Sequence, residues 1–118
     1  DNYLIIDAGM NDLIRPALYD AKHQIINVEN NKVPTKEWTI VGPICESSDV
    51  MAKNYSLGAS GGSILAIKTV GAYGHVMSSN YNSRRKPPEI LVDDNNFEII
   101  RKRETYEDLI RHEVNLGS

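Results

Sequence analysis

The chain has 118 residues, with 13 basic and 16 acidic side chains and a net charge of −3 at pH 7. This slightly acidic balance gives no electrostatic case for a nucleic-acid or anionic-membrane partner, and no apolar run approaches the roughly 20 residues needed to cross a bilayer. A hydrophobic content of 41% suits one globular domain with a modest core. The single cysteine excludes an internal disulfide and fits a reducing cytoplasm.

The first half of the chain predicts short strands and one short helix. It starts at Asp1-Asn2 without Met or a signal peptide, so we expect a fragment of a longer protein. Asn11–Ala21 predicts a short helix or a turn, in which a regular helix begins near Pro16. Glu29–Lys32 is a turn cluster. Apolar or alternating runs predict strands at Tyr3–Asp7, Gln24–Val28 and Glu37–Ile44.

The second half predicts a strand at Ser63–Val70 and then a hairpin. Glu89–Val92 and Phe97–Lys102 are its arms, and Asp93–Asn96 is its turn, because Asn and Asp tolerate left-handed conformations. Just before the hairpin, Arg84-Arg85-Lys86 is the one local basic run, typical of a solvated turn rather than a phosphate site.

Tyr106–His112 predicts a terminal helix, with Thr105 as N-cap and Asp108 in the capping-box position. Tyr106, Leu109 and Ile110 are spaced to form a buried stripe.

The number of short strands predicts the fold class. Six or so of them, separated by turns, indicate a mainly β domain over residues 1–118. We expect a β-barrel or sandwich with Greek-key-like connections and one or two short helices. Ser56–Ser63 has the composition of a flexible linker, so it is either a natural mobile loop or an engineered replacement.

Cys45 is the first candidate for chemistry. It follows Gly42-Pro43 at the end of a strand and precedes Glu46, two serines and Asp49. A thiol can act as a nucleophile or as an acid and base, or it can be a small buried core residue. Glu46 and Asp49 could hold a cationic group, whereas the Ser-Ser-Asp triplet is also typical of a loop or cap. No second cysteine or histidine lies at metal-ligand spacing.

Arg15 and Tyr19 are four residues apart, so on a helical turn they face the same way. Together they could bind a carboxylate, although an exposed Arg beside a half-buried Tyr is the plainer interpretation. Tyr73, flanked by glycines, could project towards a ligand, and Tyr81 is a weaker candidate of the same kind. Each of these aromatic rings is also compatible with a core or rim position.

Taken together, these motifs resemble one family along nearly the whole chain. Asp7–Tyr19, Gly42–Asp49, Gly71–Gly74, Met77–Arg84 and Pro87–Glu89 resemble, in order, the C-terminal domain of the diaminopimelate decarboxylase family. The related ornithine and arginine decarboxylases carry Cys-Asp-Gly where this chain has Cys-Glu-Ser, which favours diaminopimelate as the substrate.

The resemblance implies a pyridoxal-phosphate enzyme of the alanine-racemase-like fold. In that fold a (β/α)8 barrel holds the cofactor through a Schiff-base lysine, and a mainly β domain completes the site across a homodimer interface. The reaction converts meso-diaminopimelate to L-lysine, the last step of lysine biosynthesis. The barrel and its lysine are not in this chain, so the chain by itself is expected to be inactive.

The family's site residues carry over to five positions. Arg15 and Tyr19 match the substrate-binding Arg and Tyr, and Glu46 matches the acid that reads the distal amine. Cys45 matches the proton donor, which works in the partner subunit's site. Tyr73 matches the tyrosine near cofactor and substrate, and no metal site is implied. The alternatives are the same domain of another basic-amino-acid decarboxylase and a non-catalytic β module for assembly.

Overall fold

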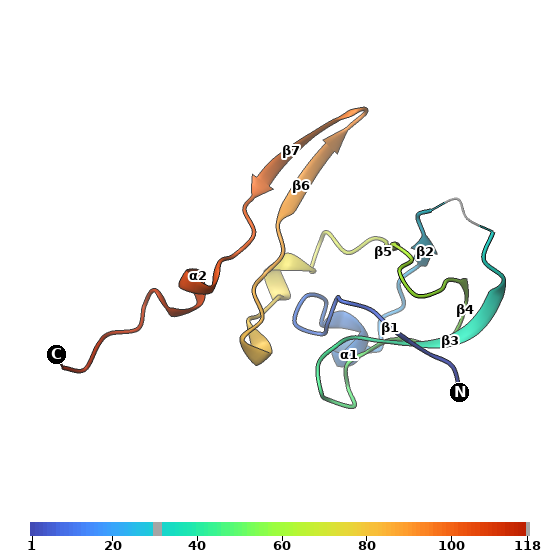
Figure 1. Cartoon of the computed structure of the whole chain (residues 1–118), viewed down its shortest axis with the longest axis horizontal. Coiled ribbons are helices and arrows are strands. Elements are labelled where there is room, and N and C mark those ends of the chain that lie inside the picture. Colours follow the sequence, from blue (N-terminus) through green and yellow to red (C-terminus); the bar gives the residue numbers. More distant parts are fainter. Residues whose placement is uncertain (30–31, 118) are drawn as a thin grey trace. The chain divides into compact units, whose positions relative to one another are not determined.

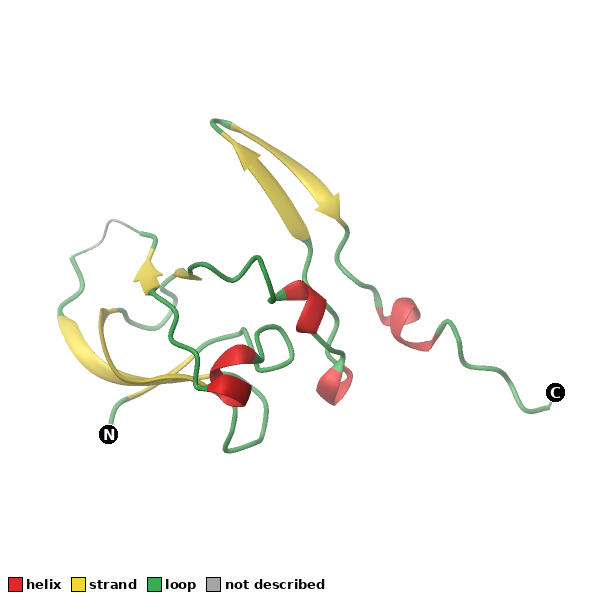
Figure 2. Ribbon diagram, turned by 180° about the vertical axis from the view of Figure 1, so that it is seen from behind, coloured by secondary structure: helices red, strands yellow, loops and turns green. Residues whose placement is uncertain are grey.

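The computed structural model describes residues 1–29 and 32–117, so the turn expected at Glu29–Lys32 lies partly outside the described residues. The chain divides into two compact units, Asp1–Ser78 and Ser79–Ser118. It is mainly sheet with two short α-helices, and the described strands form three separate sheets rather than one closed barrel (Figures 1 and 2). No helix in the described part is long and apolar enough to span a membrane.

The largest sheet of the first unit has the strand order β1-β3-β4. Its central strand β3 (Thr35–Val41) pairs in parallel with β1 (Tyr3–Ile5) and antiparallel with β4 (Val50–Gly58). Strand β4 is the longest strand among the described residues, yet it was not expected from the sequence. Asn54 has φ 51°, and the register with β3 shifts nearby, between Trp38 and Ile40. This irregularity interrupts the alternation of buried and exposed residues by which a strand is predicted.

The second sheet pairs two short strands, β2 (Ile25–Asn27) and β5 (Leu65–Ile67). The strand expected at Ser63–Val70 is therefore only three residues long. The strand expected at Glu37–Ile44 ends at Val41, where the Gly42 backbone N–H donates to the carbonyl of Asp49 at 3.0 Å and opens a loop.

The linker interpretation of Ser56–Ser63 is wrong for the first part of that segment. Ser56 to Gly58 belong to β4, and Leu57 and Ala59 are buried. Gly58 lies where a Cβ would come within 2.4 Å of the Val33 carbonyl oxygen, so close backbone packing requires glycine there. Ser56–Ala59 is therefore part of the folded core and its edge rather than a linker.

A small core lies between the two sheets of the first unit. Tyr55 on β4 connects the two sheets through Ile25 on β2. Its hydroxyl accepts from the Ile25 N–H at 2.7 Å and donates to the Ile25 carbonyl at 2.9 Å. The Trp38 indole N–H donates to the Leu57 carbonyl at 2.8 Å. The buried hydrophobic cluster consists of Leu13, Ile25, Ile40, Met51, Leu57 and Ala59.

The Asp49 carboxylate is the polar centre of the first unit. Asp49 is only 2% exposed. Its two oxygens accept backbone N–H bonds from Met10 at 2.7 Å and from Ile44 at 2.8 Å. It therefore ties the segment before helix α1 (Arg15–Tyr19) to the loop that carries the cysteine. A Cβ on Gly42 would lie 2.3 Å from one carboxylate oxygen, so glycine is required beside it.

Gly42→Ala should destabilise the first unit by about 1–3 kcal/mol, because the new methyl group displaces the Asp49 carboxylate from its N–H donors. Chemical denaturation, followed by Trp38 fluorescence, measures this change. Gly61→Ala is the matched control, because a Cβ added to Gly61 would have no atom within 4 Å. Equal stability of the two variants would contradict this role for Asp49.

The second unit contains the predicted hairpin, formed by β6 (Glu89–Asp93) and β7 (Asn96–Arg101), and the terminal helix α2 (Tyr106–Ile110). Short 3-10 turns occur at η1 (His75–Met77), in the first unit, and at η2 (Tyr81–Ser83). The hairpin turn is tighter than expected, and Asp94 adopts φ 51° in it.

The capping box of α2 is confirmed. The Thr105 hydroxyl accepts from the Asp108 N–H at 3.2 Å, and the Thr105 N–H donates to the Asp108 carboxylate at 2.8 Å. The buried stripe is wrong, since Tyr106 is 67% and Ile110 49% exposed.

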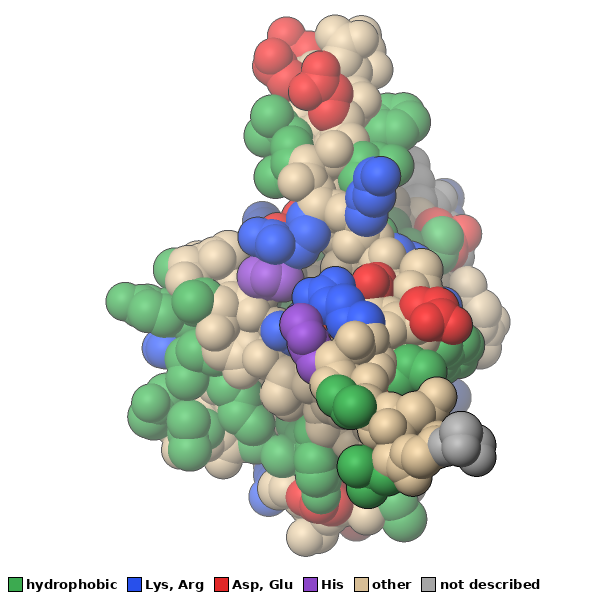
Figure 3. All heavy atoms as spheres, turned by 90° about the vertical axis from the view of Figure 1, so that its left-hand side faces the viewer, with side chains coloured by type: hydrophobic (Ala, Val, Ile, Leu, Met, Phe, Trp, Pro, Cys, Tyr) green, Lys and Arg blue, Asp and Glu red, His purple; other side chains and the backbone are tan. Residues whose placement is uncertain are grey.

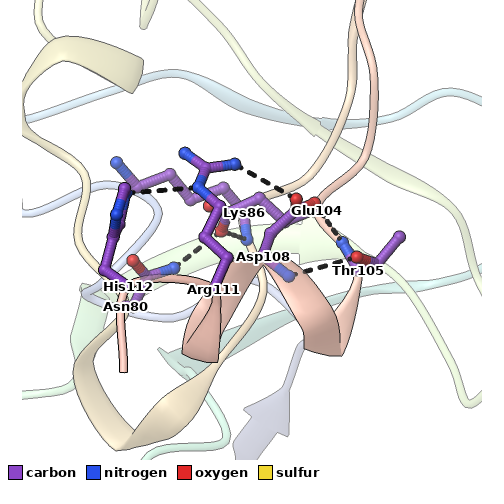
Figure 4. A network of polar contacts seen from close by, with 7 residues as sticks. All are labelled: Asn80, Lys86, Glu104, Thr105, Asp108, Arg111 and His112. Atoms are coloured by element: carbon purple, nitrogen blue, oxygen red, sulfur yellow. Dashed lines mark hydrogen bonds and ion pairs between the residues drawn. The ribbon is translucent and has the colours of Figure 1, made fainter. Parts of the chain in front are cut away.

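Glu104 clasps the loop that precedes the hairpin (Figure 4). One of its carboxylate oxygens accepts from the Lys86 N–H and from the Asn80 amide, both at 2.7 Å. The Lys86 N–H bond is the main cause that lowers the pKa of Glu104 below its ordinary 4.5. Likewise, the Thr105 N–H is the main cause that lowers the pKa of Asp108 below its ordinary 3.8.

The clasp and the helix cap should open in acid. A depressed folded pKa gives a stabilisation that is complete above the ordinary value and is lost as pH falls through the lower folded value. The amide NMR signals of Lys86 and Thr105 should therefore shift only below about pH 4. Helix α2 should be lost over the same pH range. In the Glu104→Gln variant the Lys86 amide signal should no longer change with pH, whereas the Thr105 amide signal should still do so. If both signals still changed with pH as in the wild type, Glu104 would not be the acceptor of the Lys86 N–H bond.

Candidate functional site

Helix α1 and the Gly-Ala-Tyr-Gly turn bring three expected site residues together. Arg15 begins α1 with Pro16 directly after it, and Tyr19 ends the helix one turn later. The guanidinium carbon of Arg15 lies 5.5 Å from the ring centre of Tyr19 and 5.4 Å from that of Tyr73. Residues far apart in the sequence thus meet around one cation.

This cluster has an uncompensated positive charge. Among residues 1–29 and 32–117 no carboxylate forms an ion pair with Arg15, and its contacts are with the two rings. Tyr19 is 60% and Tyr73 55% exposed, so neither is a core residue. A guanidinium held by aromatic faces is suited to a bidentate bond with a carboxylate or phosphate.

Backbone strain and a tight turn fix the position of Tyr73. Thr69 adopts φ 61°, an unfavourable conformation for a β-branched residue. The Gly74 N–H donates to the Val70 carbonyl at 2.8 Å, and a Cβ on Gly74 would lie 2.4 Å from that oxygen. This glycine was expected from the sequence to matter, whereas the left-handed conformation of Thr69 was not, because nothing in the local sequence indicates it.

Cys45 lies on the loop between β3 and β4 and is exposed. The interpretation as a buried core cysteine is therefore wrong. The loop is held by its own backbone, since the Glu46 N–H donates to the Ile44 carbonyl at 2.8 Å and the Asp49 N–H to the Glu46 carbonyl at 3.1 Å. These bonds shape the loop so that the thiol is exposed to solvent.

The two acids on this loop have different roles. Glu46 is exposed and has a 3.4 Å bond from the Ser48 hydroxyl, which leaves its carboxylate accessible to a cationic group. Asp49 is buried, and each of its carboxylate oxygens accepts a backbone N–H bond, so the expectation that it could hold a ligand's cation is corrected. The two acids are close in the sequence, and only the fold shows that one is exposed and the other buried.

In the described part of the chain the expected site residues fall into two groups, one around Arg15 and one around Cys45, and each group is called a half-site. No hydrogen bond, ion pair or ring contact in the described part joins Cys45 or Glu46 to the Arg15 cluster. A depression of about 350 Å³ between α1, β4 and the serines of the cysteine loop contains none of the expected site residues in its lining. Within the same residues, no group of three His, Cys, Asp or Glu side chains is placed to hold a metal ion.

Comparison with known sequences extends over almost the whole chain. Residues 1–71 match the family described as pyridoxal-dependent decarboxylase, C-terminal sheet domain. The diaminopimelate decarboxylase of Neisseria meningitidis serogroup B is 47% identical over 113 residues, 96% of this chain and 27% of that protein. That of Aquifex aeolicus is 42% identical over 116 residues, 98% of this chain and 28% of that protein. The chain thus spans about a quarter of the length of these curated relatives.

Solved structures agree with this similarity. Diaminopimelate decarboxylase from M. jannaschii in complex with L-lysine has a TM-score of 0.89 and 44% identity, covering 96% of this chain and 26% of that one. The Helicobacter pylori enzyme complexed with L-lysine has a TM-score of 0.86 and 46% identity, covering 92% of this chain and 27% of that one. Because the family match covers more than half of the chain, the chain belongs to the pyridoxal-dependent decarboxylases, as their C-terminal sheet domain.

Proposed function

We propose that this chain is the C-terminal part of a diaminopimelate decarboxylase, which converts meso-2,6-diaminopimelate to L-lysine and CO2. Its similar relatives carry that name, and two solved relatives contain L-lysine, the product of the reaction. The observation that carries the proposal is the Arg15 guanidinium between Tyr19 and Tyr73, without a carboxylate partner among the described residues.

Substrate recognition needs both signs of charge, because diaminopimelate has an ammonium and a carboxylate at each end. Arg15 binds a carboxylate through two parallel N–H donors, and the Tyr19 hydroxyl adds a further bond. Glu46 accepts from the distal ammonium, for which its exposed carboxylate is accessible. A substrate with an uncharged distal end would lack this last contact.

Cys45 supplies the proton that completes the reaction. Bound pyridoxal phosphate would draw off the electron pair that CO2 leaves on the α-carbon. The exposed Cys45 thiol transfers its proton to that carbon, and the resulting thiolate regains a proton from water. Tyr73 fits a place beside cofactor and substrate, because its exposed phenol lies next to a guanidinium suited to anionic groups.

The two half-sites belong to different active sites of a homodimer in this proposal. The missing barrel domain holds the cofactor through its lysine, Arg15 serves the site of its own subunit, and Cys45 serves the partner's. In the described part of the chain, no hydrogen bond, ion pair or ring contact joins Cys45 or Glu46 to the Arg15 cluster, as this division requires. The small sheets would form a β-barrel or sandwich with Greek-key-like connections once segments outside the chain add their strands, in a protein of the cytoplasm.

Cys45→Ala in the full-length enzyme should lower kcat by about 10²–10⁴-fold and leave KM within a few-fold, because the thiol acts as acid rather than as a binding group. Steady-state lysine formation measures both constants. Ser47→Ala, on the same exposed loop, is the matched control and should keep wild-type rates. Wild-type turnover in Cys45→Ala would remove the proton-donor role.

Mixing two inactive variants tests the division between subunits. Arg15→Ala and Cys45→Ala homodimers should both be inactive, but a mixed dimer has one site with both residues intact. Equal mixing with subunit exchange should restore about a quarter of all sites. No recovery, although mass spectrometry detects mixed dimers, would place both residues in one subunit's site.

A further inference from the structure

One charged side chain of the first unit lies in the interior. Charged groups ordinarily lie at the surface, where water solvates them, as the blue and red side chains on the face in Figure 3 do. Asp49 is the one charged residue that is buried among residues 1–29 and 32–117. Burying a carboxylate costs free energy unless hydrogen bonds replace its water. The two backbone N–H bonds that Asp49 accepts therefore indicate what the carboxylate is for.

The first of these bonds holds the segment that leads into the arginine half-site. The Met10 N–H donates to Oδ1 of Asp49 at 2.7 Å. The carbonyl of the preceding residue, Gly9, accepts from the Leu13 N–H at 3.1 Å, and the Leu13 side chain is buried in the core. Helix α1 begins with Arg15 two residues later. The start of α1 is thus connected to Asp49 through one hydrogen-bonded turn.

The second bond holds the loop that carries the thiol. The Ile44 N–H donates to Oδ2 of Asp49 at 2.8 Å, and the Ile44 side chain is itself buried. Cys45 is the next residue, so its Cα lies one peptide unit from this bond. The backbone of Asp49 closes the same loop, because its carbonyl accepts from the Gly42 N–H at 3.0 Å. Asp49 therefore sets the position of the Cys45 backbone as well.

We propose that Asp49 is a positioning residue for the decarboxylation, an inference that rests on the proposed function. It acts through Arg15 on carboxylate binding and through Cys45 on proton transfer. Arg15 serves the site of its own subunit and Cys45 that of the partner, so one Asp49 side chain affects both active sites of the dimer. Small displacements suffice, since a misplacement of about 1 Å can cost roughly 100-fold in rate.

Steady-state kinetics of the full-length enzyme test this role. Asp49→Leu removes both acceptor oxygens and keeps the branched shape of the side chain. It should raise KM and lower kcat, each about tenfold or more, because carboxylate binding and proton transfer both lose their geometry. Hydrogen exchange should show lost protection of the Met10 and Ile44 amides in the same variant.

Leu57→Ala is the matched control for lost stability. It leaves a cavity in the core, and Leu57 lies at the other end of β4, where it pairs with Lys36. Chemical denaturation compares the stability of the two variants. Leu57→Ala should keep kcat and KM within a few-fold of wild type.

Asp49→Asn keeps the test valid if Asp49→Leu does not fold. The amide retains one acceptor oxygen, but its NH2 group faces the second N–H donor, so one of the two bonds is lost. We expect kcat/KM to fall about tenfold. The amide that loses protection from hydrogen exchange should identify the constant that changes, KM for Met10 and kcat for Ile44.

Mixed dimers test the effect on both active sites. Arg15→Ala and Cys45→Ala subunits are expected to restore activity to each other. An Asp49→Leu subunit should restore activity to neither, because its own arginine and the cysteine that it provides to its partner are both displaced. Recovery with either subunit would show that Asp49 supports only one half-site and would overturn the proposal.

Two further results would overturn it. One is wild-type kcat and KM in folded Asp49→Leu or Asp49→Asn enzyme. The other is an equal kinetic loss in Leu57→Ala at equal stability, which would make the role of Asp49 merely structural. The proposed function fails on different results, namely wild-type turnover in Cys45→Ala or no recovery between Arg15→Ala and Cys45→Ala.

Discussion

The buried Asp49 carboxylate determines the arrangement of the first unit, because it joins the two loops that follow the paired strands β1 and β3. One loop leads into α1 and so places Arg15, while the other presents Cys45. A buried carboxylate is stable only where donors replace its lost hydration, and two backbone N–H groups do so here. The positions of Arg15 and Cys45 therefore both depend on one side chain, that of Asp49, which is not among the proposed binding or proton-transfer groups.

Rigid support and exposure are combined in the same way in both half-sites. Tyr73 is exposed on a turn closed by Gly74 and strained at Thr69, and Cys45 is exposed on a loop closed by its own backbone bonds. Neither residue owes its position to burial. Binding residues held on rigid supports lose little conformational freedom when a ligand arrives, which favours affinity and orientation.

Elements whose structure depends on neighbouring residues were predicted correctly from the sequence. Features that depend on contacts between distant residues were not. The hairpin, the start of α1 next to Pro16 and the capping box at Thr105 all follow from residues that are close in the sequence. Strand β4 was not predicted, because its irregular pairing near Asn54 disturbs the alternation of buried and exposed residues that indicates a strand. In the site, spacing alone joined Arg15 to Tyr19, whereas Tyr73 reaches them only through tertiary packing. The burial of Asp49 was likewise invisible in a run that reads as a polar loop.

The parallel pairing of β1 with β3 has a consequence for the order of folding. Tyr3 faces Thr39, so the chain must close a long loop before this pairing yields any hydrogen bond, whereas β3 and β4 are joined by a short connection. Local pairings form first because their loop-closure entropy is smaller. The β3–β4 ribbon is then the template onto which β1 docks. Because α1 follows β1 in the chain, we expect the arginine half-site to form after the cysteine loop.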